Sequence, residues 1–107
     1  MNRHKHVEWD DPGNNSVLKF YERDPQDYVE PHPGSIITAI YEGFTVRVRV
    51  EAFVDGDTSI GEVVALINPR SGERKKTHSK LEVGDMVRVP DAMRSMDRRD
   101  PDVENKH

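Results

Sequence analysis

The segment Phe44–Val54 has the most regular pattern in the sequence, because an apolar residue occupies every second position. One face would carry Phe44, Val46, Val48, Val50, Ala52 and Val54, and the other Thr45, Arg47, Arg49, Glu51 and Phe53. Such alternation, rich in β-branched valine, is typical of a strand with one buried face. The segment is long for a strand, so we expect it to bend and to serve both halves of a curled sheet.

Four further segments have strand character, and they are residues 35–41, 61–67, 73–78 and 86–89. The sequences Glu42-Gly43 and Asp55-Gly56-Asp57 favour tight turns on either side of the long strand. Residues 73–78 have no apolar face, which is typical of an edge strand protected by lysines. After these strands, residues 91–96 predict a short helix with Asp91 as its N-cap.

Five short antiparallel strands and a closing helical turn predict an all-β domain over residues 35–96. We expect a small barrel, SH3-like or OB-like, because closure removes sheet edges that a domain of this size has few elements to cover. Residues 81–89 are similar to the L-x-x-G-D-x-V-x-V turn and strand of many small barrels. A β-sandwich would need about seven strands, more than the pattern offers.

The segments on either side of this region are polar. Residues 1–34 form a proline-rich arm in which a long helix is excluded and residues 16–21 fit a short strand or one helical turn. Disordered segments contain few aromatic residues, so part of this arm should pack on its own barrel or on a partner. Residues 97–107 are expected to be a disordered charged tail. The aromatic residues of the arm are Trp9, Phe20, Tyr21 and Tyr28.

Composition and motifs exclude several classes of protein. The absence of cysteine excludes disulfide bonds, thiolate metal sites and cysteine nucleophiles. No membrane span or signal segment is visible, so we expect a cytoplasmic protein with no membrane partner. Neither a phosphate-binding glycine motif nor a nucleophile elbow occurs, so we expect no cofactor and no enzymatic activity. The net charge of −4 argues against coating nucleic acid with the whole surface.

Positive charge is concentrated in residues 70–80, which contain five cations and one anion. Lysine and arginine neutralise backbone phosphates, and small barrels add aromatic side chains for base stacking, for which Phe53 and Tyr41 are the candidates here. We therefore expect a DNA- or RNA-binding surface. A solvated edge strand with protective lysines is the simpler interpretation, and an anionic protein surface is a third. The predicted nucleic-acid-binding residues are Arg47, Arg49, Arg70, Arg74, Lys75, Lys76 and Lys80.

Two other groups of residues are candidates for a metal site and for catalytic carboxylates, and both are better explained without these roles. His4, His6, Glu8 and Asp10 alternate along the arm, but a metal site needs three or four ligands in fixed geometry, so we predict none. The carboxylates near the turns are explained as turn formers, so we predict no catalytic residue. The sequence thus favours a non-catalytic binding module that contacts nucleic acid through a basic hairpin. The alternative is a protein-interaction or assembly module, including a homodimer, that uses the barrel and the aromatic arm.

Overall fold

The computed structural model describes residues 5–23, 26 and 30–96. Within them the chain is mostly β, with few helical residues, so the predicted all-β class is confirmed. The elements in chain order are η1 (Gly13–Asn15), α1 (Val17–Arg23), β1 (Ile36–Tyr41), β2 (Phe44–Val54), β3 (Thr58–Ile67), β4 (Arg74–Lys75), β5 (Thr77–His78), β6 (Leu81–Glu82), β7 (Met86–Pro90) and η3 (Asp91–Met93).

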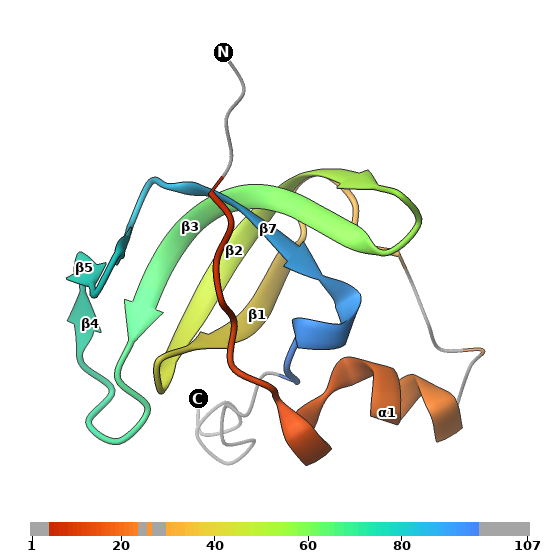
Figure 1. Cartoon of the computed structure of the whole chain (residues 1–107), viewed down its shortest axis with the longest axis horizontal. Coiled ribbons are helices and arrows are strands. Elements are labelled where there is room, and N and C mark those ends of the chain that lie inside the picture. The colour runs from red at the N-terminus through yellow and green to blue at the C-terminus, as the bar shows by residue number, and fades with distance from the viewer. Residues whose placement is uncertain (1–4, 24–25, 27–29, 97–107) are drawn as a thin grey trace, which may run out of the picture.

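Five strands form one antiparallel sheet in which β3 has the most partners (Figure 1). The order is β1-β2-β3-β4, and β7 also pairs with β3. β4 pairs with the C-terminal end of β3, where Lys75 lies opposite Leu66, and β7 pairs with its N-terminal half. β5 and β6 form a separate two-stranded ribbon. Strand pairing among the described residues does not close the sheet into a barrel.

Three local predictions are wrong. The edge strand expected over residues 73–78 is divided at Lys76 into β4, which pairs with β3, and β5, which pairs with β6. The division occurs where the Lys76 carbonyl accepts a hydrogen bond from the Val83 N–H, just after β6. β3 begins at Thr58 rather than at Gly61. The helix expected over residues 91–96 is only the 3-10 turn η3, because Arg94 is extended where its backbone bridges to β1. Its N-cap is Pro90, not Asp91.

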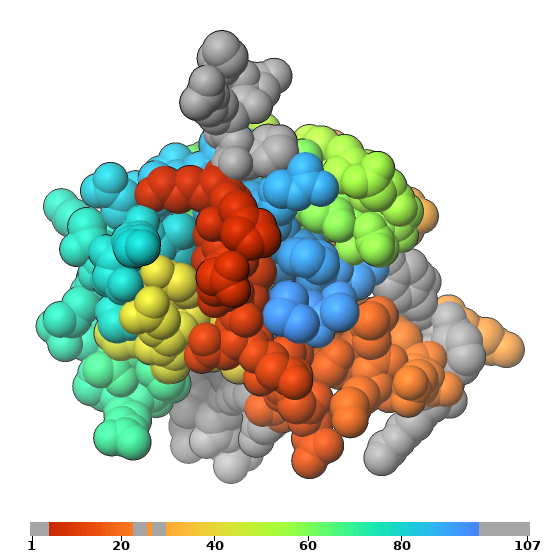
Figure 2. Space-filling model, viewed as in Figure 1, coloured from red at the N-terminus to blue at the C-terminus, as the bar shows by residue number. Residues whose placement is uncertain are grey.

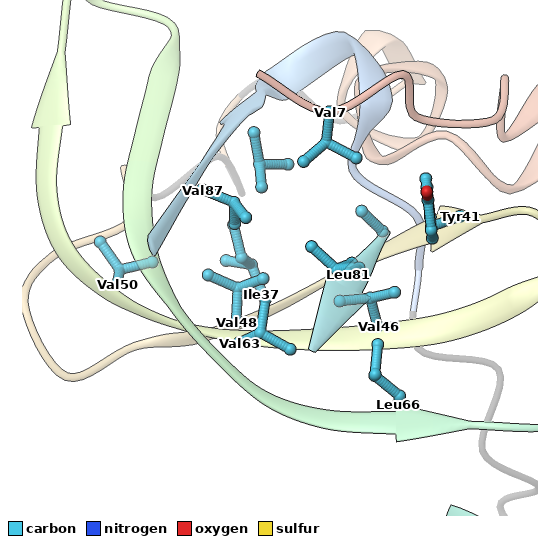
Figure 3. Close-up of a cluster of buried hydrophobic side chains, with 12 residues drawn as sticks. Val7, Ile37, Tyr41, Val46, Val48, Val50, Val63, Leu66, Leu81 and Val87 are labelled. Atoms are coloured by element: carbon cyan, nitrogen blue, oxygen red, sulfur yellow. The ribbon is translucent and has the colours of Figure 1, made fainter. Parts of the chain in front are cut away.

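The core is built on the face of β2 that the alternation predicts. Val46, Val48 and Val50 are at most 1% exposed, whereas Arg49 and Glu51 point to solvent. The alternation of burial ends at a register shift between Val50 and Ala52, after which the strand is half-buried on both sides. Figure 3 shows these valines packed against side chains of the other strands and of the arm: Val7, Ile37, Tyr41, Val63, Leu66, Leu81 and Val87. Ala39 and Val89 complete the core.

Residues 5–10 cross the open side of the sheet between β7 and β1 (Figures 1 and 2). At one end the Lys5 N–H donates to the Met86 carbonyl at 2.7 Å, and at the other the Asp10 N–H donates to the Ile40 carbonyl at 2.7 Å. Val7, between them, is 8% exposed and belongs to the core. The arm therefore fills part of the gap that the strands leave open.

Residues 94 and 95 lie between β1 and the start of α1, because Arg94 bridges to Ala39 and Ser95 bridges to Ser16. Ser16 caps α1, because its Oγ accepts the Leu18 N–H at 3.2 Å, so residues 16–21 adopt the helical one of the two predicted conformations. The Val17 N–H donates to the Arg94 carbonyl, and the Ser95 N–H donates to the Thr38 carbonyl. These bonds link α1 to β1 through the C-terminal end of the described chain.

Gly61 allows β2 and β3 to approach closely. It lies opposite Val50, beside the register shift. A Cβ added at Gly61 would overlap the Arg49 carbonyl oxygen and lie 2.8 Å from Val48 Cγ1, so backbone atoms would have to move. The curl of the sheet at this point thus depends on the absence of a side chain.

We expect Gly61→Ala to lower the free energy of unfolding by about 1–3 kcal/mol, because overpacking displaces two paired strands. Urea denaturation followed by tryptophan fluorescence measures this. The control is Gly56→Ala, which adds a Cβ in open space and costs only the strain of a positive φ of 76°, about 1–2 kcal/mol. A smaller loss for Gly61→Ala than for Gly56→Ala would contradict the close approach.

Candidate nucleic-acid interface

Residues 70–80 form an exposed basic segment on one side of the molecule, shown in green to teal in Figure 2. The turn before β4 is shaped by Asn68, whose Oδ1 accepts the Arg70 N–H at 2.9 Å and whose carbonyl accepts the Gly72 N–H at 2.7 Å. Within residues 5–23, 26 and 30–96, the cations of this segment form no ion pair. The exposed cations are Arg70, Arg74, Lys75, Lys76 and Lys80.

Arg47 and Arg49, the other two predicted residues, lie on the outer face of β2. Arg49 is neutralised, because its Nη2 lies 2.6 Å from Glu62 Oε1 on the neighbouring strand. Arg47 is half-buried and its Nε is shielded from solvent. Arg49 is therefore paired and Arg47 is partly buried, whereas the five cations of the basic segment are exposed.

The pairing registers show how far Arg47 on β2 lies from Arg74 in the basic segment. Arg47 lies opposite Ala65 on one side of β3, and Arg74 lies opposite Ile67 on the other side. Cross-strand partners share a face, so both arginines are on the same face but two strand spacings apart, at least about 10 Å. The structure thus places five of the seven predicted residues in one segment and the other two on the adjoining sheet face.

The two aromatic candidates from the sequence are poorly placed for stacking. Tyr41 is 5% exposed, and its hydroxyl accepts the Lys80 N–H at 3.4 Å. Phe53 is half-buried and lies opposite Ser59, at the far end of β2 from β4. Neither ring offers a free face beside the basic segment.

The aromatic ring of the basic segment is His78, which the sequence interpretation did not single out. Its ring stacks on Phe44, with centroids 3.7 Å apart and planes 14° apart, and meets Tyr41 edge-on at 6.1 Å. Its Nε2 lies 3.1 Å from the Glu42 carbonyl oxygen. Tyr41 in turn meets Trp9 edge-on at 6.2 Å. The only sequence signal for this role is the position of His78 between Lys76 and Lys80.

The turn between β1 and β2 supports this cluster. Glu42 and Gly43 have positive φ angles of 47° and 82°, and both backbone N–H groups donate to the carboxylate of Asp10, at 3.1 and 2.9 Å. The Ser79 hydroxyl donates to Glu42 Oε2 at 3.2 Å. The turn is therefore connected both to the N-terminal arm and to the β5–β6 ribbon.

The carboxylate of Asp10, one of the four alternating residues of the arm, thus accepts hydrogen bonds from two backbone N–H groups. His6 lies 3.3 Å from Glu8, and His4 is outside the described residues. Across the described part of the chain, no group of three or more histidine and carboxylate side chains is placed to hold a metal ion.

Two open grooves flank the arm, with volumes of about 330 and 340 Å³. Each combines acidic and basic side chains with one aromatic wall, formed by Tyr41 in the first and Trp9 in the second. The arm residues His6, Val7 and Glu8 line both grooves.

Comparison of the chain with protein-family models, curated proteins and solved structures gives no match. None of the helices in the described residues is long and apolar enough to cross a membrane. The function is therefore argued from the chemistry of the basic segment and its surroundings.

We expect Asp10→Ala to destabilise the protein by about 1–3 kcal/mol, because two backbone donors of the β1–β2 turn lose their acceptor. Asp10→Asn, which keeps one acceptor oxygen, should lose less. Glu8→Ala is the matched control, since this exposed carboxylate pairs with the exposed side chain of His6. Thermal and urea unfolding measure the stability of the three variants. An equal loss of stability for Asp10→Ala and Glu8→Ala would contradict the role of Asp10.

Proposed function

We propose that this protein is a non-catalytic module that binds DNA or RNA through the basic segment at residues 70–80. We propose further that its sheet, arm and terminal segment form a small barrel of SH3-like or OB-like type. The backbone bridges of Lys5 to Val87 and of Arg94 to Ala39 support the barrel, because they add main-chain contacts along its open side.

The observation that carries the binding proposal is an unneutralised cluster of cations in a chain with a net charge of −4. Four cations elsewhere in the described chain each have a carboxylate 2.6–3.7 Å away: Lys5, Arg49, Arg88 and Arg94. The cations of residues 70–80 have no such carboxylate among the residues that the structure describes. A local cluster of this kind attracts a polyanion and releases its counterions on binding.

Edge protection accounts for only part of this cluster. β4 is only Arg74–Lys75, so protective charges on an edge strand explain those two residues. Arg70, Lys76 and Lys80 lie outside β4, in turns and at the bend before β5. The breadth of the cluster therefore favours a ligand over protection of the sheet edge.

We expect Lys75→Ala and Lys76→Ala each to weaken binding to oligonucleotides and to reduce the slope of log K against log salt by about 0.7–0.9. Fluorescence anisotropy titrations between 20 and 200 mM salt, on the order of the range in which such slopes are resolved, measure this. Lys19→Ala on α1 is the charge-matched control and should leave the slope unchanged. No binding by the unmodified protein at low salt, or an equal effect of Lys19→Ala, would contradict the proposal.

Assembly through an apolar surface is the second candidate. Val7 is buried and the Trp9 Nε1–H donates to the Arg88 carbonyl at 2.7 Å, so this part of the arm is engaged with its own sheet. On α1, however, Leu18 is 38% exposed and Phe20 is 43% exposed. These two side chains favour α1, rather than residues 5–10, as the contact surface.

If α1 mediates assembly, sedimentation equilibrium should show a dimer that a Leu18→Ser, Phe20→Ser double variant converts to a monomer. Removing two exposed apolar side chains lowers the apolar area available for burial in an interface. Lys19→Ala, between them, is the control and should leave the mass unchanged. A monomer at all concentrations for the unmodified protein would exclude assembly through this helix.

A further inference from the structure

The basic segment contains one aromatic ring, and its position identifies the form of nucleic acid that would fit. His78 ends β5, with Lys76 before the strand and Lys80 in the turn after it. We infer that the site binds single-stranded nucleic acid, with His78 as the ring on which an unpaired base stacks. Lys76 and Lys80 are the phosphate contacts on either side of it. This inference rests on the proposed function.

The His78 ring is fixed in the free protein. Phe44 lies parallel to it at 3.7 Å, Tyr41 meets it edge-on, and Nε2 is 3.1 Å from the Glu42 carbonyl oxygen. A ring held by two aromatic neighbours and one polar contact loses little conformational entropy when a base stacks on it. Such preorganisation increases affinity.

The ring also remains accessible. His78 is half-buried, and its neighbours Thr77 and Ser79 are exposed. Phe44 covers one face of the ring, so the proposed base would stack on the opposite face. A base stacked there would extend the Phe44–His78 stack by one layer.

Single strands suit this arrangement better than duplexes. Proteins that bind single strands combine a basic surface along the backbone with aromatic rings on which successive bases stack. In a duplex the faces of the bases are already stacked on one another, so the ring would have no partner. A two-stranded ribbon such as β5–β6, with Lys76 before it and Lys80 in its turn, can also enter the major groove of a duplex, and this is the competing mode that the test must separate.

The test compares a twelve-nucleotide single strand of thymidine with a duplex of about the same length, by fluorescence anisotropy at several salt concentrations. We expect tighter binding of the single strand. His78→Ala should weaken it at least about fivefold at every salt concentration without changing the salt slope, because stacking releases no counterions. His78→Phe, which keeps a ring, should restore most of the affinity. Lys76→Ala should instead reduce the slope.

A measurement on the unmodified protein makes the test independent of whether the variants fold. In NMR spectra, the ring protons of His78 should shift upfield on addition of the single strand, and those of His32, exposed on another part of the chain, should not. Thermal unfolding of both His78 variants shows whether the fold is retained.

The outcomes separate this inference from the proposed function. Binding of the duplex at least as tight as that of the single strand, with no effect of His78→Ala and no shift of the His78 ring protons, would overturn the stacking role and leave nucleic-acid binding in place. An equal loss for His78→Phe and His78→Ala would also overturn it. No binding of either oligonucleotide would contradict the proposed function itself.

Discussion

The structure depends on a segment of backbone that is not one of its strands. β1 and β7 lie on either side of an opening, and residues 5–10 cross it with one hydrogen bond to Met86 and one to Ile40. Val7 enters the core at the centre of this crossing. Without it, the valine face of β2 would be open to water on that side, and burial of this face is the main source of stability in so small a domain.

The candidate interface is connected to the same segment. Asp10 accepts hydrogen bonds from the β1–β2 turn, and Glu42 of this turn contacts His78 and Ser79. These two residues lie between Lys76 and Lys80, two cations of the basic segment. A two-stranded ribbon alone is marginally stable in water. Its position, and with it the spacing of Lys76 and Lys80, therefore comes from tertiary contacts. The Lys5 ammonium contributes another by donating to the Lys80 carbonyl at 2.9 Å.

Features that depend on one strand could be predicted from the sequence, and those that depend on pairing could not. The burial of Val46, Val48 and Val50 follows from alternation alone. The pairing of Arg49 with Glu62 does not, because it requires the register shift after Arg47, which leaves Val64 unpaired and brings Glu62 opposite Arg49. The stacking of His78 on Phe44 likewise requires two strands of different sheets to meet. The density of charged residues in the sequence identified the basic segment, but only the fold shows which cations lack an ion pair within the described part of the chain.

The net charge and the local charge act on a polyanion over different distances. At physiological salt the interaction of exposed charges fades beyond about 8 Å, so a phosphate backbone near residues 70–80 responds mainly to their five cations and one anion. The remaining surface of a chain with a net charge of −4 repels it. In the proposed binding mode, this asymmetry favours an orientation with residues 70–80 towards the nucleic acid. In that orientation His78, within the ribbon, would be presented to the bases.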